Sequence, residues 1–286
     1  AVRYWGALGF LMRGAAAVDT GQATLRTALS DSSPHVRIVV AEALAAHELG
    51  AAPRPGPMLA VLGTLVVSNV MANQVLPSWA YIPWNCSVAA VLVVIAVKAD
   101  HCSANDLGLA RRRLPDGLRW GAAVSAGLLA IYLVGLALPA TRDLFRDDRA
   151  DVGTSALLWR TLVAIPLGTV LMEEIAFRGV LPAMFRRRTS RHANGALRAD
   201  VYAALLFGVW HVLPSLDLTE ANPALRDLLP GPLGVIAAIA GGVIGTAAAG
   251  MGLSWLRNRS GSLAAPAMLH ISSNSIGYVL AWLVQR

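Results

Sequence analysis

The sequence predicts an all-α protein: a polytopic bundle of about seven transmembrane helices, preceded by a small α-helical segment. Hydrophobic residues make up 56% of the 286 residues and charged residues only 14%, whereas an ordinary soluble domain carries about 25% charged residues. The mean hydropathy is +0.56. The charged residues gather in short segments between long stretches of Leu, Val, Ala, Ile and Gly. This layout is typical of a protein that crosses the membrane several times.

Residues 1–56 differ from the rest of the chain and are expected to lie outside the membrane. A Trp/Leu/Met stretch ends at Arg13, and helical periodicity follows on either side of a polar turn at 31–34, which ends in Pro34. The two short amphipathic helices around this turn resemble a single HEAT-like repeat, which cannot bury its own apolar face. We interpret the segment as a helical appendage without chemistry, and docking on a protein partner stays open.

Apolar runs fill the second predicted domain, residues 57–286. They cover 59–76, 83–97, 118–139, 156–185, 199–213, 231–256 and 262–284. A bilayer core of about 30 Å needs roughly 20 helical residues, so we expect the second run to begin near Trp79 or to tilt. Small residues recur at spacings of three and four in 241–252, which favours close helix packing in lipid.

Loop charges predict the orientation of the chain. Most loop arginines lie in three segments, which are 98–119, 186–198 and the connector with Arg257 and Arg259. The loops that alternate with these segments contain fewer arginines and several acidic residues. By the positive-inside rule, these segments and the amino terminus are cytoplasmic, and seven spans would place the carboxyl terminus outside. The net charge of +7 does not indicate nucleic acid, because no basic stripe interleaves with aromatic residues.

Residue usage gives a source and a location. Lys98 is the only lysine among the 24 basic residues, and alanine is abundant, a bias that fits a GC-rich bacterial genome. The expected location is therefore a bacterial plasma membrane. Cys86 lies in an apolar run and Cys102 in a polar connector, so neither a disulfide nor a cysteine metal site is expected.

Polar residues inside the fourth run point to chemistry, because ionisable groups in membrane helices cost several kcal/mol and face the bundle interior. The run reads LGTVLMEEIAFRGV, with Glu173 and Glu174 side by side. Arg178 follows Glu174 by four residues, a spacing that favours an ion pair on one helix face. Glu173 points about 100° away, without a local cation, and suits proton transfer. Both glutamates could instead only tie helices together.

Two further runs carry polar groups at a similar depth. His211 lies in the fifth run, one turn after Phe207, and His270 and Asn274 share a face of the seventh run. At about 1.5 Å per residue, Glu173, His211 and His270 all lie about 12 to 18 Å from the cytoplasmic ends of their runs. A lone histidine on an apolar helix is more often a core residue, but the agreement in depth predicts one shared site.

Three motifs carry a family resemblance. EEIAFR resembles the EExxxR motif, FGVWH resembles FxxxH, and HISSN resembles HxxxN of the CPBP (CAAX-protease-like, Abi) family of intramembrane proteases. The motifs occur in the family's order, and SLAAP before His270 resembles the lead-in to the third. The resemblance covers roughly 57–286, and the amino-terminal segment departs from it. The family includes CAAX endopeptidases and bacteriocin-processing or immunity-type proteins.

The resemblance implies glutamate-dependent hydrolysis of a membrane-associated peptide or protein. The roles that it implies for six residues are activation of water by Glu173 with His211, organisation of the site by Glu174 and Arg178, and stabilisation of the oxyanion by His270 with Asn274. No serine or cysteine nucleophile is needed. The resemblance favours a metal-free mechanism, yet some members are labelled metalloproteases. A zinc ion held by Glu173, His211 and His270 stays open, although no HExxH occurs.

Two other functions compete with an endopeptidase. A non-catalytic membrane scaffold or immunity-type protein would use the same polar residues for packing or partner binding. A small-solute transporter would use them as a proton relay, but the two halves of the chain show no obvious internal repeat, which counts against it.

Overall fold

The computed structural model describes residues 2–13, 15–50, 54–190, 194–216, 221–228 and 230–286, and no strand occurs among them. The chain forms two compact units, Ala1–Arg54 and Pro55–Arg286. The second unit supplies six helices long and apolar enough to cross a membrane, counted over the described residues. The prediction of an all-α, polytopic helical bundle is therefore confirmed.

The first unit contains three helices, α1 (Val2–Arg13), α2 (Ala15–Ala28) and α3 (Pro34–Gly50). The turn before α3 is held by Asp31, whose carboxylate accepts a hydrogen bond of 2.8 Å from the backbone N–H of Ser33. The three helices share an apolar core that contains Leu25 and Val40. The Trp/Leu/Met stretch is thus a third helix, which supplies the cover that two helices alone would lack.

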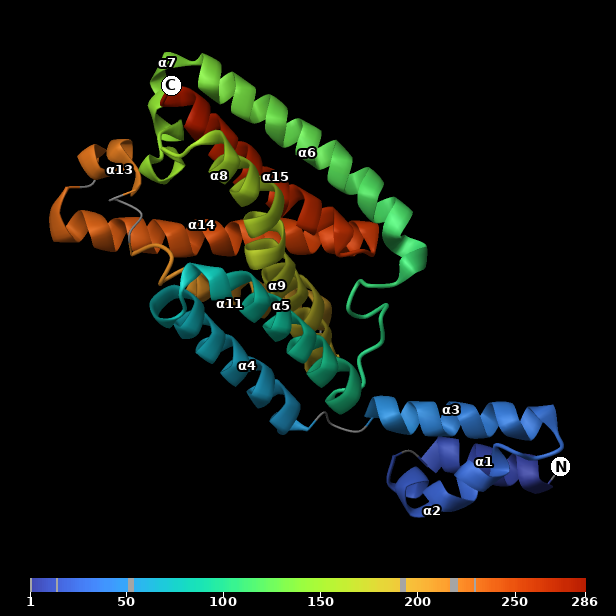
Figure 1. Cartoon of the computed structure of the whole chain (residues 1–286). Coiled ribbons are helices and arrows are strands. Elements are labelled where there is room, and N and C mark those ends of the chain that lie inside the picture. The colour runs from blue at the N-terminus through green and yellow to red at the C-terminus, as the bar shows by residue number, and fades with distance from the viewer. Residues whose placement is uncertain (1, 14, 51–53, 191–193, 217–220, 229) are drawn as a thin grey trace. The chain divides into compact units, whose positions relative to one another are not determined.

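Six candidate spans cross the second unit (Figure 1). They are α4 with η1 (Pro55–Val75), α5 with η2 (Ser78–Ala99), η3 with α6 (Arg111–Ala137), α8 to α10 (Thr154–Thr189), α14 (Gly231–Ser260) and α15 (Ala264–Val284). Short helices α7 (Pro139–Arg142) and α13 (Pro223–Leu228) lie between spans. The second span begins at Ser78, close to the expected Trp79.

The fifth predicted run is shorter than a span. It forms α11 (Gly195–Trp210), whose 16 residues extend about 24 Å, less than the bilayer core of about 30 Å. The expected count of about seven becomes six candidate spans and α11. The outside position predicted for the carboxyl terminus rested on seven spans and loses that basis.

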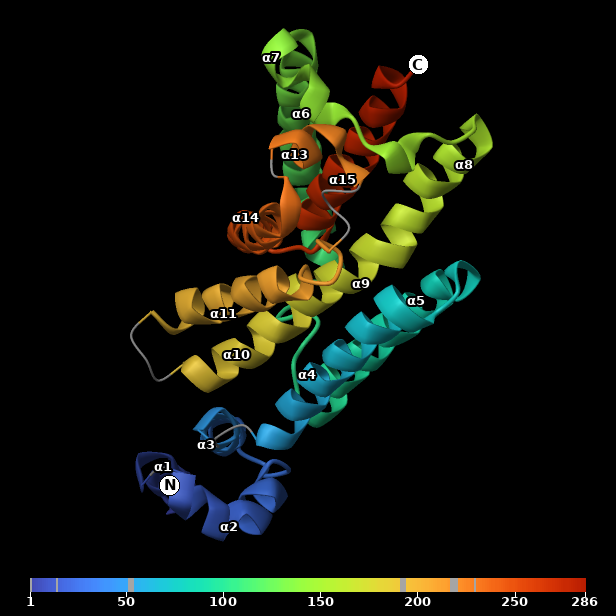
Figure 2. The ribbon, with the colours of Figure 1, turned by 90° about the vertical axis from the view of Figure 1, so that its left-hand side faces the viewer.

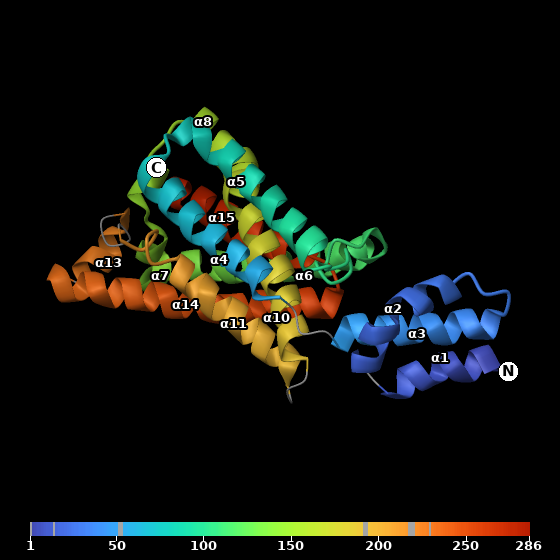
Figure 3. The same cartoon turned by 90° about the horizontal axis from the view of Figure 1, so that it is seen from below.

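The fourth span alternates between α-helical and π-helical hydrogen bonding. Its segments in order are α8 (Thr154–Trp159), η6 (Arg160–Val170), α9 (Leu171–Glu174), η7 (Ile175–Val180) and α10 (Leu181–Thr189). Pro166 lies inside η6 and lacks the backbone N–H that an α-helical ladder needs. Helix α5 runs along this span, and α4 packs against α5 (Figures 2 and 3). Single π-helical turns are frequent at functional sites.

Helix α15 is joined to the fourth span by polar contacts along its length. The hydroxyl of Ser275 donates a hydrogen bond of 2.8 Å to the carbonyl of Thr161. Two turns further on, the indole of Trp282 donates one of 2.8 Å to the carbonyl of Val152. These bonds satisfy polar groups that lipid could not, and they fix the position of α15 against the fourth span.

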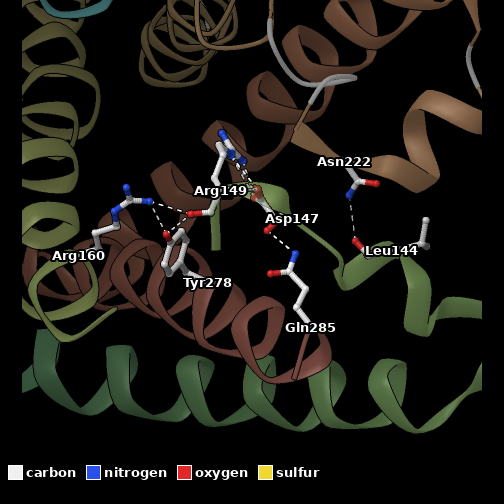
Figure 4. Close-up of polar contacts among 7 residues, drawn as sticks. All are labelled: Leu144, Asp147, Arg149, Arg160, Asn222, Tyr278 and Gln285. Carbon is white, nitrogen blue, oxygen red and sulfur yellow. Dashed lines mark hydrogen bonds and ion pairs between the residues drawn. The ribbon is translucent and has the colours of Figure 1, made fainter. Parts of the chain in front are cut away.

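The carboxyl end of α15 is also fastened to the loop that precedes α8 (Figure 4). The Tyr278 hydroxyl donates to the carbonyl of Arg149 and accepts a hydrogen bond from Arg160. The amide of Gln285 donates a hydrogen bond of 2.6 Å to the carbonyl of Asp147. The carboxyl half of α15 is thereby held in register with the start of the fourth span.

Helices α11 and α14 approach each other closely through glycine. A Cβ on Gly208 would lie 2.6 Å from the carbonyl oxygen of Val243, and one on Gly250 would lie 3.3 Å from Cα of Ala204. Glycine at these positions lets the two backbones approach, as in many membrane helix pairs. The end of α11, where Trp210 and His211 lie, is therefore positioned by α14.

Candidate active site

The two glutamates occupy α9, the short α-helical segment between two π-helical ones. Glu173 is 5% exposed and Glu174 is 2% exposed. Neighbouring helical residues point about 100° apart, so the two carboxylates face different partners. Glu173 faces Trp210 of α11, and Glu174 faces Arg178 on its own span. His270 of α15 lies close to both carboxylates.

Glu174 forms the centre of a buried charged group. Its Oε1 lies 3.3 Å from Nη1 of Arg178, the pair expected from the spacing, and 2.8 Å from Nδ1 of His270. Arg178 is 1% exposed, and its guanidinium lies 3.8 Å from the centroid of the Phe207 ring. A carboxylate accepts hydrogen bonds, so in this contact Nδ1 of His270 would be the donor.

Glu173 has one bound and one free carboxylate oxygen. The indole Nε1 of Trp210 donates a hydrogen bond of 3.0 Å to Oε1. The other oxygen, Oε2, is buried, accepts no hydrogen bond from any described residue, and lies 3.7 Å from Nε2 of His270. Two polar atoms from different helices thus face each other at a separation longer than a direct hydrogen bond.

His211 lies at the edge of this group. It follows the last residue of α11, and its Nδ1 lies 2.8 Å from the carbonyl oxygen of Phe207. The Phe207 ring contacts both imidazoles edge to face, with centroids 4.5 Å from His211 and 6.1 Å from His270. Phe207 therefore brings His211 into the region, but the partner of Glu173 on α11 is Trp210.

Asn274 lies one turn after His270 on α15. Its Oδ1 accepts a hydrogen bond of 3.3 Å from the hydroxyl of Ser273. The described contacts thus join Glu173, Glu174, Arg178 and His270 directly, whereas His211 is linked to the group through Phe207 and Asn274 only by its place one turn after His270.

Trp210 is a site residue that the sequence motifs did not single out. An indole N–H in an apolar helix needs an acceptor, and Trp210 directly precedes His211 in FGVWH. The need of this indole for a hydrogen-bond acceptor was the one feature of the sequence that could have indicated a contact with a glutamate. Its backbone is held as well, because the amide of Asn69 donates a hydrogen bond of 2.9 Å to the Trp210 carbonyl.

The donor set does not fit the zinc site that the sequence left open. Among the described residues, no group of three His, Cys, Asp or Glu side chains is arranged to hold a metal ion. Of the three ligands considered, Glu173 and His270 lie close together, whereas no described contact joins His211 to either of them. The described side chains therefore do not form a metal site.

An apolar pocket of about 200 Å³ shares Trp210 with this group of residues. Its lining comes from α4, η7 and α11 and includes Leu65, Asn69, Phe177, Val209 and Trp210. Trp210 forms part of the pocket wall and also binds Glu173. A single indole therefore separates an apolar pocket from a buried carboxylate.

The comparisons with known proteins agree with the motifs. Residues 154–276 match a family model described as type II CAAX prenyl endopeptidase Rce1-like. No curated protein and no solved structure matches the chain. The matched stretch begins with α8 and contains all six candidate site residues, EEIAFR, FGVWH and HISSN included. The match supports a protease, and the candidate spans support a protein that crosses the membrane several times; residues 154–276 are thus similar to the Rce1-like type II CAAX prenyl endopeptidase domain, which is consistent with the CPBP family.

Proposed function

We propose that the protein is an intramembrane endopeptidase in which Glu173 activates a water molecule for attack on a peptide bond. The observation that carries this proposal is the pair formed by Oε2 of Glu173 and Nε2 of His270, 3.7 Å apart in a buried site. With a proton on Nδ1, neutral His270 offers Nε2 as an acceptor. A water molecule that donates to both atoms directs its lone pairs outward, toward a carbonyl carbon.

The bond changes balance with these groups alone. The water oxygen bonds to the carbonyl carbon while its proton passes to the Glu173 carboxylate. The protonated Glu173 then gives this proton to the amide nitrogen as the carbon–nitrogen bond breaks, which leaves an acid and an amine. Glu173 ends as it began and serves first as base and then as acid.

Glu174 and Arg178 act in this scheme as positioning residues. The Oε1 atom of Glu174 holds His270 through Nδ1 and is itself held by Arg178. A hydrogen bond at one ring nitrogen fixes the tautomer and orientation of an imidazole. We therefore assign His270 a role in binding water, in place of the oxyanion role that the family resemblance implies for it. Asn274 and His211 remain as donors for the oxyanion.

The substrate class follows from the surroundings of the site. The carboxylates lie inside helices of membrane-spanning length, and the adjoining pocket of about 200 Å³ is lined mainly by apolar side chains. An apolar pocket with few polar groups favours an apolar ligand. We infer a membrane-associated peptide or protein with an apolar segment next to the bond that is cut.

The test is cleavage by the purified protein in nanodiscs. The probes are two internally quenched peptides, one carrying a farnesylated CAAX-type end and one with an unmodified apolar segment. Glu173→Gln keeps the acceptor oxygen for Trp210 but removes the base. The rate of cleavage should therefore fall about a hundredfold to ten-thousandfold. Glu42→Gln, which changes an exposed glutamate of α3, is the matched control and should cleave as the unchanged protein does.

Full activity in a folded Glu173→Gln protein would contradict the mechanism. Equal thermal unfolding of the two variants and the unchanged protein establishes that folding is the same. A chain that cleaves neither probe, and whose Glu173→Gln variant restores function in a deletion strain, would be a scaffold and not a protease.

A further inference from the structure

A cluster of tryptophan and arginine lies where α6 begins and α14 ends, away from the carboxylates. Trp255 and Arg259 are one turn apart on the last part of α14. Trp120 of α6 packs edge to face against Trp255, with centroids 6.0 Å apart. The guanidinium of Arg259 lies 5.5 Å from the centroid of the Trp120 ring. The three side chains form one continuous surface, on two helices that Figure 1 shows meeting here.

Two further arginines lie near this surface, one by its contact with the end of α14 and one by its place next to Trp120 in the sequence. Arg113 packs across Gly261, directly after α14, where a Cβ would lie 3.3 Å from its Cδ. Arg119 precedes Trp120 and is exposed. Among the described residues, no acidic side chain lies within ion-pair distance of Arg119 or Arg259, and Arg113 has only an exposed contact of 3.8 Å with Asp116. The cluster therefore carries positive charge that the protein does not neutralise.

The position of the cluster identifies the kind of ligand. The helices that carry it, η3 with α6 and α14, are both candidate spans, and the cluster lies at their ends. Exposed apolar side chains continue from it along the helices, namely Ile131 of α6 at 68% and Ile244 of α14 at 69% exposed. Indole rings favour the boundary between lipid tails and headgroups. The arginines, the indoles and the exposed apolar side chains therefore match the headgroup, the glycerol region and the acyl chains of a phospholipid in turn.

We propose that this cluster is a binding site for the phosphate headgroup of an anionic phospholipid. Arg259, Arg113 and Arg119 would contact the phosphate, since guanidinium groups bind phosphate in a bidentate manner. Trp120 and Trp255 would lie against the glycerol and the first part of the acyl chains. Basic pockets between membrane helices are the usual sites for such headgroups.

The loop at the other end of α6, residues 138–153, differs from this cluster in how its arginines are paired. Arg146 lies 3.2 Å from Asp143, and Arg149 lies 2.7 Å from Asp147, so these two arginines are neutralised by neighbouring carboxylates. Arg142 of that loop is exposed, as Arg259 is, but within the described part of the chain its guanidinium lies over no tryptophan ring. Its removal changes the net charge of the protein by the same amount, which makes it a matched control.

The experiment is native mass spectrometry of delipidated protein mixed with equal amounts of phosphatidylglycerol and phosphatidylcholine. The unchanged protein should retain phosphatidylglycerol preferentially. Arg259→Gln should lower this retention about fivefold, as expected for one arginine near a membrane surface, and Arg142→Gln should leave it unchanged. Arg119→Gln, on the other helix, is a second variant that keeps the test decisive where Arg259→Gln does not fold.

Three results would overturn the proposal. Equal retention of the two lipids would show that the cluster does not select anionic headgroups. An equal effect of Arg142→Gln would show that only net charge matters. Displacement of the bound lipid by millimolar inorganic phosphate would show a site for soluble phosphate. None of these results bears on cleavage by Glu173, which the lipid site does not use.

Discussion

The indole of Trp210 donates a hydrogen bond of 3.0 Å to the carboxylate of Glu173, and this bond joins α11 to the fourth span. The same indole forms part of the wall of the apolar pocket. Trp210 therefore connects the position where an apolar segment would bind with the group that would activate water.

Replacement of Trp210 by Phe should lower cleavage while the protein stays folded. The change keeps an aromatic ring in the pocket wall but removes the donor that orients Glu173. A hydrogen bond to a charged group is worth about 1.5 to 3 kcal/mol, so the rate should fall about tenfold to a hundredfold. The measurement is the initial cleavage rate in nanodiscs. Trp79→Phe, at a side chain 79% exposed, is the control and should be neutral; a similar loss there would argue against a specific role.

Glu174 and Arg178 should depend on each other for stability. Glu174→Gln leaves a buried guanidinium without its counter-charge, which costs about 3 to 5 kcal/mol. In the double variant Glu174→Gln with Arg178→Met, no charge is left unpaired, so it should unfold at a higher temperature than Glu174→Gln alone. Thermal unfolding in detergent measures both. Additive destabilisation in the double variant would contradict a direct pairing of the two residues.

Gly208 should tolerate no side chain. A methyl group there would meet the backbone oxygen of Val243 at 2.6 Å, so α11 and α14 would have to separate. Such overpacking costs about 1 to 3 kcal/mol, and cleavage should fall because Trp210 lies two residues away. Gly245→Ala, on α14 and with open space around it, is the control. Unchanged unfolding temperatures for Gly208→Ala would mean that the helices are not in close contact.

Cys102 should be almost inert toward alkylation. Burial and the negative charge of Asp100 raise the pKa of its thiol to about 12. At pH 8, the reactive thiolate is then about a thousandfold rarer than for a thiol with a pKa near 9. In a Cys86→Ser protein, iodoacetamide should label the folded chain far more slowly than the unfolded chain. Rapid labelling of the folded chain at pH 8 would contradict this environment.

The same pKa gives a sign for stability in alkaline solution. Between pH 9 and 12 the folded chain keeps the Cys102 proton that the unfolded chain loses, so stability falls as the pH rises through this window. Below pH 9 the thiol is protonated in both states and contributes no pH dependence. Cys102→Ala should show a smaller loss of unfolding temperature across the window than the unchanged protein.

Features that depend on neighbouring residues of one helix could be predicted from the sequence. The four-residue interval between Glu174 and Arg178 gave an ion pair, and the apolar runs gave the helical class. Contacts between helices were not accessible in the same way. The hydrogen bond from Trp210 to Glu173 was not predicted, whereas His211 follows the end of α11 and bonds to its own helix, so its expected role with Glu173 stays a prediction. The apolar run that forms α11 was also predicted to be a span, because hydropathy indicates how apolar a segment is but not how long its helix will be.

The π-helical turns of the fourth span bear on how this region can change in length. A π-helical turn holds more residues than an α-helical one. A deletion in Arg160–Val170 could therefore be absorbed by a return to α-helical bonding, without rotation of the glutamates. A deletion within Leu171–Glu174 has no such reserve and would turn a carboxylate by about 100°. Length variation among related chains is expected before α9 and not inside it.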